Sequence, residues 1–233
     1  YGWDLAKLES AELKGGDDVE ELDGRGLAAV PGLVDCHTHG CFAGDRTEEF
    51  ALRAGGASYE ELHAAGGGIL STVRATRGAG EEELGAAVRR HRGWMLRWGT
   101  TTFESKSGYG LDSDTELASL RTIAAEGGVP TYLGLHAVPP EFDDAESYVE
   151  FVIGEVLPRA AKLAEAADVF LERGAFDAAQ ARRFLEAARD HGLALRLHAD
   201  QFTEAGGVEL AIELGARSVD HLEATSERGV AAL

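Results

Sequence analysis

Pro31-Gly-Leu-Val-Asp-Cys-His-Thr-His39 is the segment of this 233-residue chain that decides its fold. Its first half is apolar and predicts a β-strand, and its second half is a His-x-His pair. Residues two apart on a strand share a face, so the imidazoles of His37 and His39 can point at one place. Neutral imidazole is the commonest metal ligand in proteins. Two from one rigid segment therefore predict half of a zinc or iron site.

The bulk composition is that of an ordinary globular protein, with 44% hydrophobic and 27% charged residues. A formal net charge of -19 argues against binding to nucleic acid or to an anionic membrane surface, because both need a basic face. No apolar run approaches the roughly 20 residues of a membrane span, and no leader pattern opens the sequence. A disulfide between Cys36 and Cys41 would distort the histidine strand, so we expect reduced thiols and a cytoplasmic location.

From residue 28 onward, short apolar segments alternate with longer helical patterns. The strands are expected at Ala28–Cys36, Thr100–Ser105, Thr131–His136, Asp168–Glu172, Ala194–His198 and Ser218–His221. Apolar residues at helical spacing predict helices between them, around Leu84–Trp98, Leu117–Ile123 and Phe184–Ala188. The expected helix starts are Asp114 and Asp177, and the expected stops are Gly127 and Gly192. Strands alternating with helices imply βαβ units and a parallel sheet.

Polar residues with useful chemistry stand at the C-terminal end of nearly every expected strand. They are His37, His39, Glu104, Lys106, His136, Glu172, His198, Asp200 and His221. A TIM barrel builds its active site at that rim from several strands, whereas an open doubly wound sheet binds its ligand at one switch point. Gly66-Gly-Gly68 follows a helical pattern and not a strand, so it does not predict a nucleotide site.

We therefore predict an α/β fold, an incomplete (β/α)8 TIM barrel with about six of its eight units. Residues 28–233 would form this partial barrel. Residues 1–27 would be the remnant of a small N-terminal β-domain of sandwich type.

A catalytic metal needs about three protein ligands and an open position for water. His198 is the best third ligand, and the alternative is a core histidine that donates to a backbone carbonyl. His221 fits either a ligand or a proton-transfer group near the reacting water. His136 fits a ligand, a substrate contact or a structural histidine, and we favour the substrate contact.

Two residues near this rim are open to two interpretations each. Arg46 could clamp a substrate carboxylate or form a surface ion pair with Asp45 or Glu48. Tyr109 lies between glycines after the second strand and could bond or stack with a ligand. Five further residues are expected to be structural: Glu172 and Lys106 as ion-pair members, and His63, His91 and His191 as surface or structural histidines.

Together these motifs resemble the amidohydrolase superfamily, in which a metal lies at the mouth of a (β/α)8 barrel. They are more narrowly similar to the imidazolonepropionase family. The similar segments are Pro31–His39, Phe42–Arg46, Gly66–Ile69 with Ser71–Arg77, Lys106–Gly110, His136–Pro140 and Leu197–Gln201. The similarity extends from about Gly24 to the last residue.

This resemblance implies a role for each matched residue. The metal, zinc or iron, would be held by His37, His39 and His198, and His221 would lie near the reacting water. The substrate would be bound by Arg46, Tyr109, His136 and Gln201, with Tyr59 beside it.

The implied activity is metal-dependent hydrolysis of the cyclic amide of 4-imidazolone-5-propanoate to N-formimidoyl-L-glutamate, in histidine degradation. The small-molecule substrate would be the partner of a cytoplasmic enzyme that forms a homodimer at full length. One alternative is a related cyclic amidohydrolase or aminohydrolase that acts on another ring. Another is a non-catalytic protein that keeps a vestigial site.

The sequence departs from the family pattern in two places. Gly40-Cys41 follows the histidine pair where bulkier apolar residues are usual, so we expect a looser wall there. The family's remaining metal ligand is an aspartate on the eighth strand, and the sequence stops at Leu233 before that strand. We therefore expect the chain to be a fragment of a longer enzyme, poorly active or inactive by itself.

Overall fold

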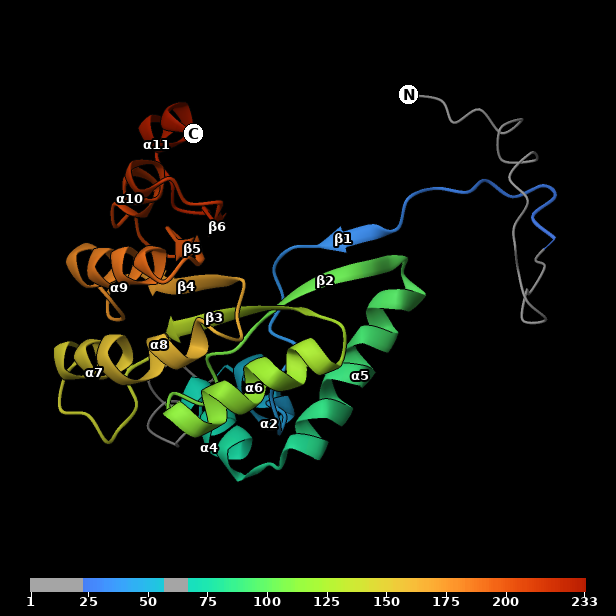
Figure 1. Ribbon diagram of the computed structural model, residues 1–233, viewed down its shortest axis with the longest axis horizontal. Coiled ribbons are helices and arrows are strands. Elements are labelled where there is room, and N and C mark those ends of the chain that lie inside the picture. Colours follow the sequence, from blue (N-terminus) through green and yellow to red (C-terminus); the bar gives the residue numbers. More distant parts are fainter. Residues whose placement is uncertain (1–22, 57–66) are drawn as a thin grey trace. The chain divides into compact units, whose positions relative to one another are not determined.

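The computed structural model describes residues 23–56 and 67–233 (Figure 1). The chain divides into two units, Tyr1–Pro31 and Gly32–Leu233, and every helix and strand named below lies in the second. The predicted small β-domain falls mostly outside the described residues. Its boundary after residue 27 stays a prediction.

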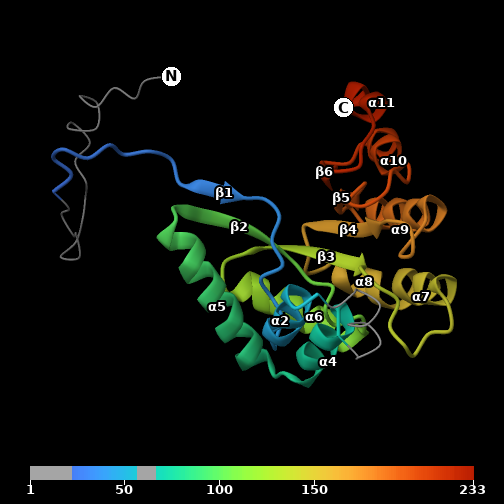
Figure 2. The same cartoon turned by 180° about the vertical axis from the view of Figure 1, so that it is seen from behind.

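One sheet of six parallel strands runs through the second unit in sequential order, β1 to β6 (Figures 1 and 2). The strands are β1 (Leu33–Asp35), β2 (Thr100–Lys106), β3 (Val129–Leu135), β4 (Ala166–Leu171), β5 (Ala194–Ala199) and β6 (Ser218–His221). Sequential order with parallel pairing is the arrangement of a (β/α)8 barrel wall. The prediction of an incomplete barrel is therefore confirmed, and the six strands form a half-barrel.

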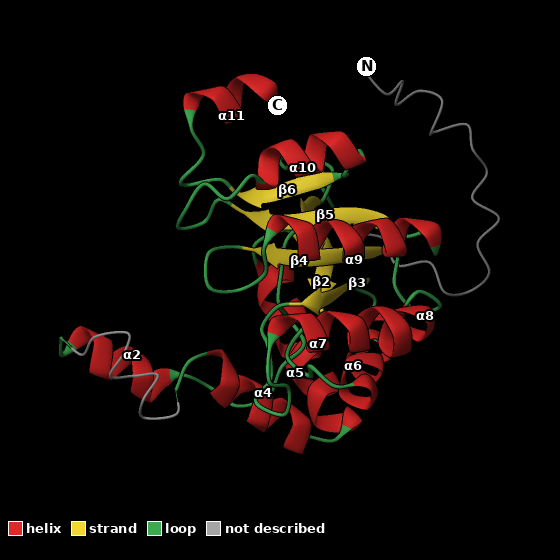
Figure 3. Ribbon diagram, turned by 90° about the vertical axis from the view of Figure 1, so that its left-hand side faces the viewer, coloured by secondary structure: helices red, strands yellow, loops and turns green. Residues whose placement is uncertain are grey.

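Helices connect and cover these strands (Figure 3). They are α2 (Thr47–Ala54), α4 (Ile69–Gly78), α5 (Glu81–Arg97), α6 (Ser113–Ala125), α7 (Ala145–Phe151), the π-helix η1 (Val152–Val156), α8 (Leu157–Ala160), α9 (Ala178–Asp190), α10 (Gly207–Leu214) and α11 (Glu227–Ala232). Helix α5 packs on β2, α6 on β3, α9 on β4 and α10 on β5. None of the helices in the two described ranges has the length and apolar character that crossing a membrane requires.

The sheet is curved enough to bring its first and last strands together at their carboxyl ends. Nδ1 of His37, just after β1, lies 3.1 Å from Oδ2 of Asp220 in β6. In a flat sheet the first and sixth strands would be about 24 Å apart, at about 4.8 Å per strand. Curvature is therefore what turns six separate strand ends into one site.

Strands β2 to β6 begin and end within two residues of their predicted positions, but β1 is much shorter than the predicted Ala28–Cys36. Pro31 has no N–H to donate to a ladder, which disfavours a strand through it. Pairing begins only at Leu33, whose N–H donates to the carbonyl of Gly99 at 2.8 Å.

Helix boundaries follow the capping chemistry. Asp177 caps α9 as predicted, in a capping box with Gln180. The prediction of Asp114 as a helix start is wrong, because Asp112 is the N-cap of α6 and accepts a hydrogen bond from the N–H of Thr115 at 2.8 Å. Asp112 has the extended backbone that an N-cap needs, and Asp114 already lies in the first helical turn.

The predicted stops at Gly127 and Gly192 are confirmed. Each follows the last residue of its helix by two positions and has a positive φ, 80° and 84° respectively. Glycine adopts this left-handed conformation at no steric cost.

Candidate active site

Five histidines that are far apart in the sequence meet at the carboxyl ends of the strands. The ring centre of His37 lies 4.5 Å from that of His198 and 5.4 Å from that of His221. The ring of His39 lies 5.3 Å from that of His198 and 5.4 Å from that of His136. The structure thus brings together every histidine that the sequence placed at a strand end.

The imidazole nitrogens are spaced as metal ligands would be. One nitrogen from each of His37, His198 and His221 lies within 4.8 Å of the other two. Nε2 of His39 faces Nε2 of His198 at 3.2 Å. Two imidazole nitrogens about 2.0–2.1 Å from one tetrahedral ion would be about 3.3–3.4 Å apart, so this spacing fits a shared ion.

The environment of His39 keeps its imidazole neutral, as a metal ligand must be. Its Nδ1 is buried without a hydrogen-bond partner. Burial, followed by the charges of the neighbouring His136, His198, His37 and Lys106, lowers the pKa of His39 to about 2. The four imidazoles of His37, His39, His198 and His221 form a donor set suited to zinc or to iron.

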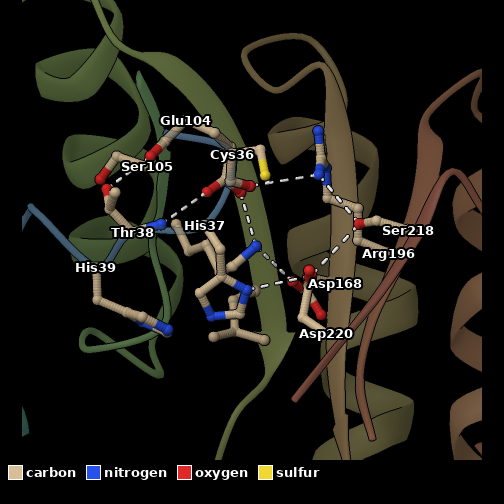
Figure 4. A network of polar contacts seen from close by, with 12 residues as sticks. Cys36, His37, Thr38, His39, Glu104, Ser105, Asp168, Arg196, Ser218 and Asp220 are labelled. Carbon is tan, nitrogen blue, oxygen red and sulfur yellow. Dashed lines mark hydrogen bonds and ion pairs between the residues drawn. The ribbon is translucent and has the colours of Figure 1, made fainter. Parts of the chain in front are cut away.

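Acidic residues orient two of these imidazoles from behind. Nδ1 of His198 lies 3.0 Å from Oδ1 of Asp168, which leaves Nε2 of His198 as the atom that faces the cluster. Nδ1 of His37 lies 3.1 Å from Oδ2 of Asp220, and Figure 4 shows these two side chains next to each other. A carboxylate behind a histidine is the usual support of a metal ligand, because it fixes the imidazole's tautomer and orientation.

The His-x-His segment itself is fastened to strand β2 (Figure 4). The N–H of Thr38 donates to Oε2 of Glu104 at 3.1 Å, and the Thr38 hydroxyl donates to the Glu104 carbonyl at 2.6 Å. The N–H of Gly40 donates to Oγ of Ser105 at 3.0 Å. The two histidines therefore project from a backbone that is held on both sides of His39.

His221 stands on strained backbone at the end of β6. His221 has φ 81° and Leu222 has φ 70°, both in the left-handed region. Such residues cost about 1–3 kcal/mol each and cluster at functional sites. Asp200 holds the turn in place, since its carbonyl accepts from the N–H of Ala224 at 2.7 Å and its Oδ2 accepts from the hydroxyl of Thr225 at 2.9 Å.

The residues expected to bind substrate lie at different distances from this cluster. The Tyr109 ring centre is 5.8 Å from that of His39 and 5.2 Å from that of His136. Gln201 lies in the loop between β5 and α10. Tyr59 lies outside the described residues, so its predicted position beside the substrate stays a prediction.

Arg46 is the N-cap residue of α2 and forms an ion pair that the sequence analysis did not identify. Its Nε and Nη2 donate to Oε2 of Glu49 at 3.0 and 2.8 Å. The suggested partners Asp45 and Glu48 are therefore wrong. Helical spacing explains the choice, because residues three apart meet on one face of a helix.

Of the residues expected to be structural, Lys106 forms the predicted ion pairs, with Glu104 and Asp168. Glu172 does not fit the same description, because its carboxylate accepts hydrogen bonds from the backbone N–H groups of Arg173, Phe202 and Thr203. It thereby holds the loop that carries Gln201.

The remaining predicted structural histidines are not among the five that meet at the strand ends. Nδ1 of His91 lies 2.8 Å from the carbonyl of Gly40, and His191 is the C-cap residue of α9. His63 lies outside the described residues.

Three acidic residues around the site were missed as functional candidates: Asp168, Asp220 and Glu116. A signal for Asp168 was available, since it is the one charged residue in the apolar run of β4. Glu116 precedes Leu120 and Ile123 at helical spacing and so shares their buried face.

Comparison with known proteins identifies relatives along nearly the whole chain. The curated Imidazolonepropionase of Rubrobacter xylanophilus is 65% identical over 224 residues, which cover 94% of this chain and 54% of that protein. The Imidazolonepropionase of Herpetosiphon aurantiacus is 48% identical over 245 residues, covering 98% of this chain and 57% of that protein. By sequence, the chain belongs to the imidazolonepropionase family. It spans about half the length of the curated relatives it matches.

Other comparisons add little to this assignment. No protein-family model matches the chain. Among solved structures, the carboxyl transferase domain of Rhizobium etli pyruvate carboxylase aligns with a TM-score of 0.42 and 18% identity, over 58% of this chain and 23% of that chain. A likeness of that size supports no conclusion about this chain.

Proposed function

We propose that this chain carries most of the active site of a metal-dependent hydrolase that opens the ring of 4-imidazolone-5-propanoate to N-formimidoyl-L-glutamate. The meeting of His37, His39, His198 and His221 at one end of the half-barrel carries the proposal. The 65% identity to a protein named Imidazolonepropionase supplies the substrate class. The reaction would belong to cytoplasmic histidine degradation, in a full-length protein that forms a homodimer.

In the proposed site, His37, His39 and His198 would hold zinc or iron, and the ion would supply a Lewis acid and an activated water when bound. His221 stands next to His37 and His198, where it takes a proton from the attacking water and returns it to the departing ring nitrogen. This transfer lets the cyclic amide open without a free charged nitrogen.

The other residues would select the substrate. Arg46 would pair with the propanoate carboxylate and exchange its Glu49 partner for that of the substrate. Tyr109 and His136 would contact the ring, since both lie beside His39. Gln201 would donate and accept hydrogen bonds at the ring edge, as an amide can do both.

The direct test is hydrolysis of 4-imidazolone-5-propanoate by the longest natural polypeptide that contains this sequence, purified and loaded with zinc or with iron. We expect turnover, with N-formimidoyl-L-glutamate as the product. A folded, metal-loaded protein that shows no turnover would disprove the assignment. Turnover of another cyclic amide or an amino-substituted ring in its place would favour the related hydrolases.

The carboxylate clamp has its own test in Arg46→Ala. A charge-assisted hydrogen bond contributes about 1.5–3 kcal/mol, so we expect KM to rise roughly 10- to 100-fold with a smaller change in kcat. Arg53→Ala is the matched control, because Arg53 is an exposed arginine in the last turn of the same helix. An unchanged KM in Arg46→Ala would show that Arg46 does not bind the carboxylate.

A further inference from the structure

A fully buried lysine lies between two buried carboxylates beneath the histidine cluster. Nζ of Lys106 is 2.8 Å from Oε1 of Glu104 and 2.8 Å from Oδ2 of Asp168, and the three side chains are 0%, 4% and 0% exposed. We call Glu104, Lys106 and Asp168 the Lys106 bridge. Removing an ammonium group from water costs several kcal/mol even when it is paired. An apolar side chain at position 106 would avoid this cost. The buried charge of Lys106 therefore indicates a role beyond packing.

The two ends of the bridge each reach a segment that carries histidines of the cluster. Oδ1 of Asp168 accepts from Nδ1 of His198 at 3.0 Å. Oε2 of Glu104 accepts from the N–H of Thr38, the residue between the two histidines of the His-x-His pair, at 3.1 Å. Lys106 therefore holds one oxygen of each carboxylate, while the second oxygen of Asp168 contacts His198 and that of Glu104 contacts Thr38. In this way it connects the histidine of β5 with the two histidines that follow β1.

We propose that Lys106 is a positioning residue for the metal-binding histidines. It acts by fixing the rotation of the Asp168 and Glu104 carboxylates, and this inference rests on the metal site proposed above. With Oδ2 of Asp168 held by Lys106, Oδ1 is left for His198. His198 then carries its proton on Nδ1 and presents the Nε2 lone pair to His39 and the ion.

A purely structural ion pair predicts something different. Its loss would lower stability but would leave the tautomer of His198 unchanged. Charge alone also predicts the opposite effect on metal binding. Removing the positive charge of Lys106 leaves the region more negative, and that should strengthen the binding of a cation.

The experiment uses the longest natural polypeptide that contains this sequence, with two variants, Lys106→Met and Asp168→Asn. Methionine keeps a long apolar side chain without the charge. Asparagine has one oxygen, for which His198 and Lys106 would compete as donors. Thr131→Val is the matched control, because Thr131 pairs with Lys106 across β2 and β3, is fully buried, and has a side-chain oxygen without a hydrogen-bond partner.

Two readouts are measured on folded protein, with folding checked by circular dichroism. The affinity for Zn²⁺ alone is measured by competition with a chelator. The tautomer of His198 is measured on metal-free protein by long-range nitrogen-15 NMR, with the signal assigned by its loss in His198→Gln. Neither measurement uses the substrate, so a failure of the proposed hydrolysis leaves both outcomes interpretable.

We expect metal-free wild-type and Thr131→Val proteins to show His198 protonated on Nδ1 and to bind Zn²⁺ equally well. In Lys106→Met and Asp168→Asn we expect a mixture of tautomers and Zn²⁺ affinity lower by about 10- to 100-fold. Unchanged or tighter Zn²⁺ binding in either folded variant would overturn the proposal. If neither variant folds, the wild-type spectrum still decides, because a proton on Nε2 of His198 contradicts the mechanism directly.

Discussion

Asp168 and Glu116 are both almost fully buried carboxylates near the histidine cluster, yet their pKa values shift in opposite directions. Burial by itself raises the pKa of both. At Asp168 the neighbouring His198 and Lys106 outweigh burial, and the pKa falls well below its ordinary range. At Glu116 burial prevails over hydrogen bonds from Ser107 and from backbone N–H groups, and the pKa stays raised.

The comparison extends to the residues around each carboxylate. Burial tends to lower the pKa of Lys106, but Asp168 and Glu104 outweigh it and the pKa is raised. Lys106 and Asp168 therefore both favour their charged forms. Oε1 of Glu116 accepts from the N–H groups of Gly110 and Leu111, both at 2.8 Å, and so holds the loop that carries Tyr109. The pKa values of Glu116 and Tyr109 are both raised, so the ionisable groups at this loop favour their neutral forms.

His136 belongs to the same neutral side. Its Nδ1 lies 2.8 Å from the carbonyl of Gly108, whose own N–H donates to Oε2 of Glu116 at 2.9 Å. Burial lowers the pKa of His136 to about 4. A full counter-charge keeps a buried group ionised, whereas hydrogen-bonding dipoles around these groups do not fully offset burial. We call the Lys106 bridge, behind the histidines, the charged wall. We call Glu116, His136 and the loop 108–111, which are expected to face the substrate, the neutral wall.

The largest expected effect is at the charged wall. Lys106→Met leaves Glu104 and Asp168 buried without their cation, and we expect the free energy of unfolding to fall by about 3–5 kcal/mol in urea titrations. Adding Glu104→Gln and Asp168→Asn should recover part of this loss. If the triple variant is no more stable than Lys106→Met, the cost lies in packing and not in uncompensated charge.

The next effect concerns pH at the neutral wall. The pKa of His136 falls from 6.5 to about 4 on folding, so between these values the unfolded chain binds more protons than the folded one. The stability that His136 contributes is therefore present above pH 6.5 and lost as pH falls toward 4, by up to about 3 kcal/mol. Urea titrations should show that the free energy of unfolding falls less between pH 7 and pH 4.5 in His136→Gln than in the wild-type protein. An equal loss in both proteins would contradict the assignment of this pH dependence to His136.

Glu116→Gln should cost less, about 1–3 kcal/mol of unfolding free energy at pH 7. Glutamine keeps one acceptor oxygen but presents an NH₂ group to one of the backbone donors. The loop that Glu116 holds carries Tyr109 and contacts His136, and neither residue is a proposed metal ligand. We therefore expect the Zn²⁺ affinity to stay unchanged. A large fall in Zn²⁺ affinity would show that the two walls are not separate.

The smallest effect is expected outside both walls, at the helix cap Asp177. Its Oδ1 accepts from the N–H groups of Ala179 and Gln180, both at 2.9 Å, in an exposed setting. Asp177→Ala should cost about 1 kcal/mol, measured by urea titration. If Asp177→Ala and Glu116→Gln lowered the free energy of unfolding equally, burial would not increase the stability that a carboxylate gains by binding backbone amides.

Much of the architecture could be predicted from local patterns. The strand–helix alternation gave the parallel sheet, and the glycines at 127 and 192 ended their helices as expected. The prediction failed at Ala28–Cys36, where Pro31 interrupts the pairing, and at Asp114, where Asp112 competed as a cap. The first error overlooked a local signal, the proline. The second is a choice between two nearby aspartates with the same capping propensity, which a local pattern does not resolve.

The sequence alone determined which residue types stand at the strand ends and which family the chain resembles, because these features depend on near neighbours and on motif spacing. Tertiary structure alone decided which charges meet. Asp168 and Lys106 are 62 residues apart, and only the curvature of the sheet places both beneath His198. Buried charges are stabilised by partners that lie close in space and not in sequence. The carboxylates and the lysine that support the histidines could therefore be identified only in the folded structure.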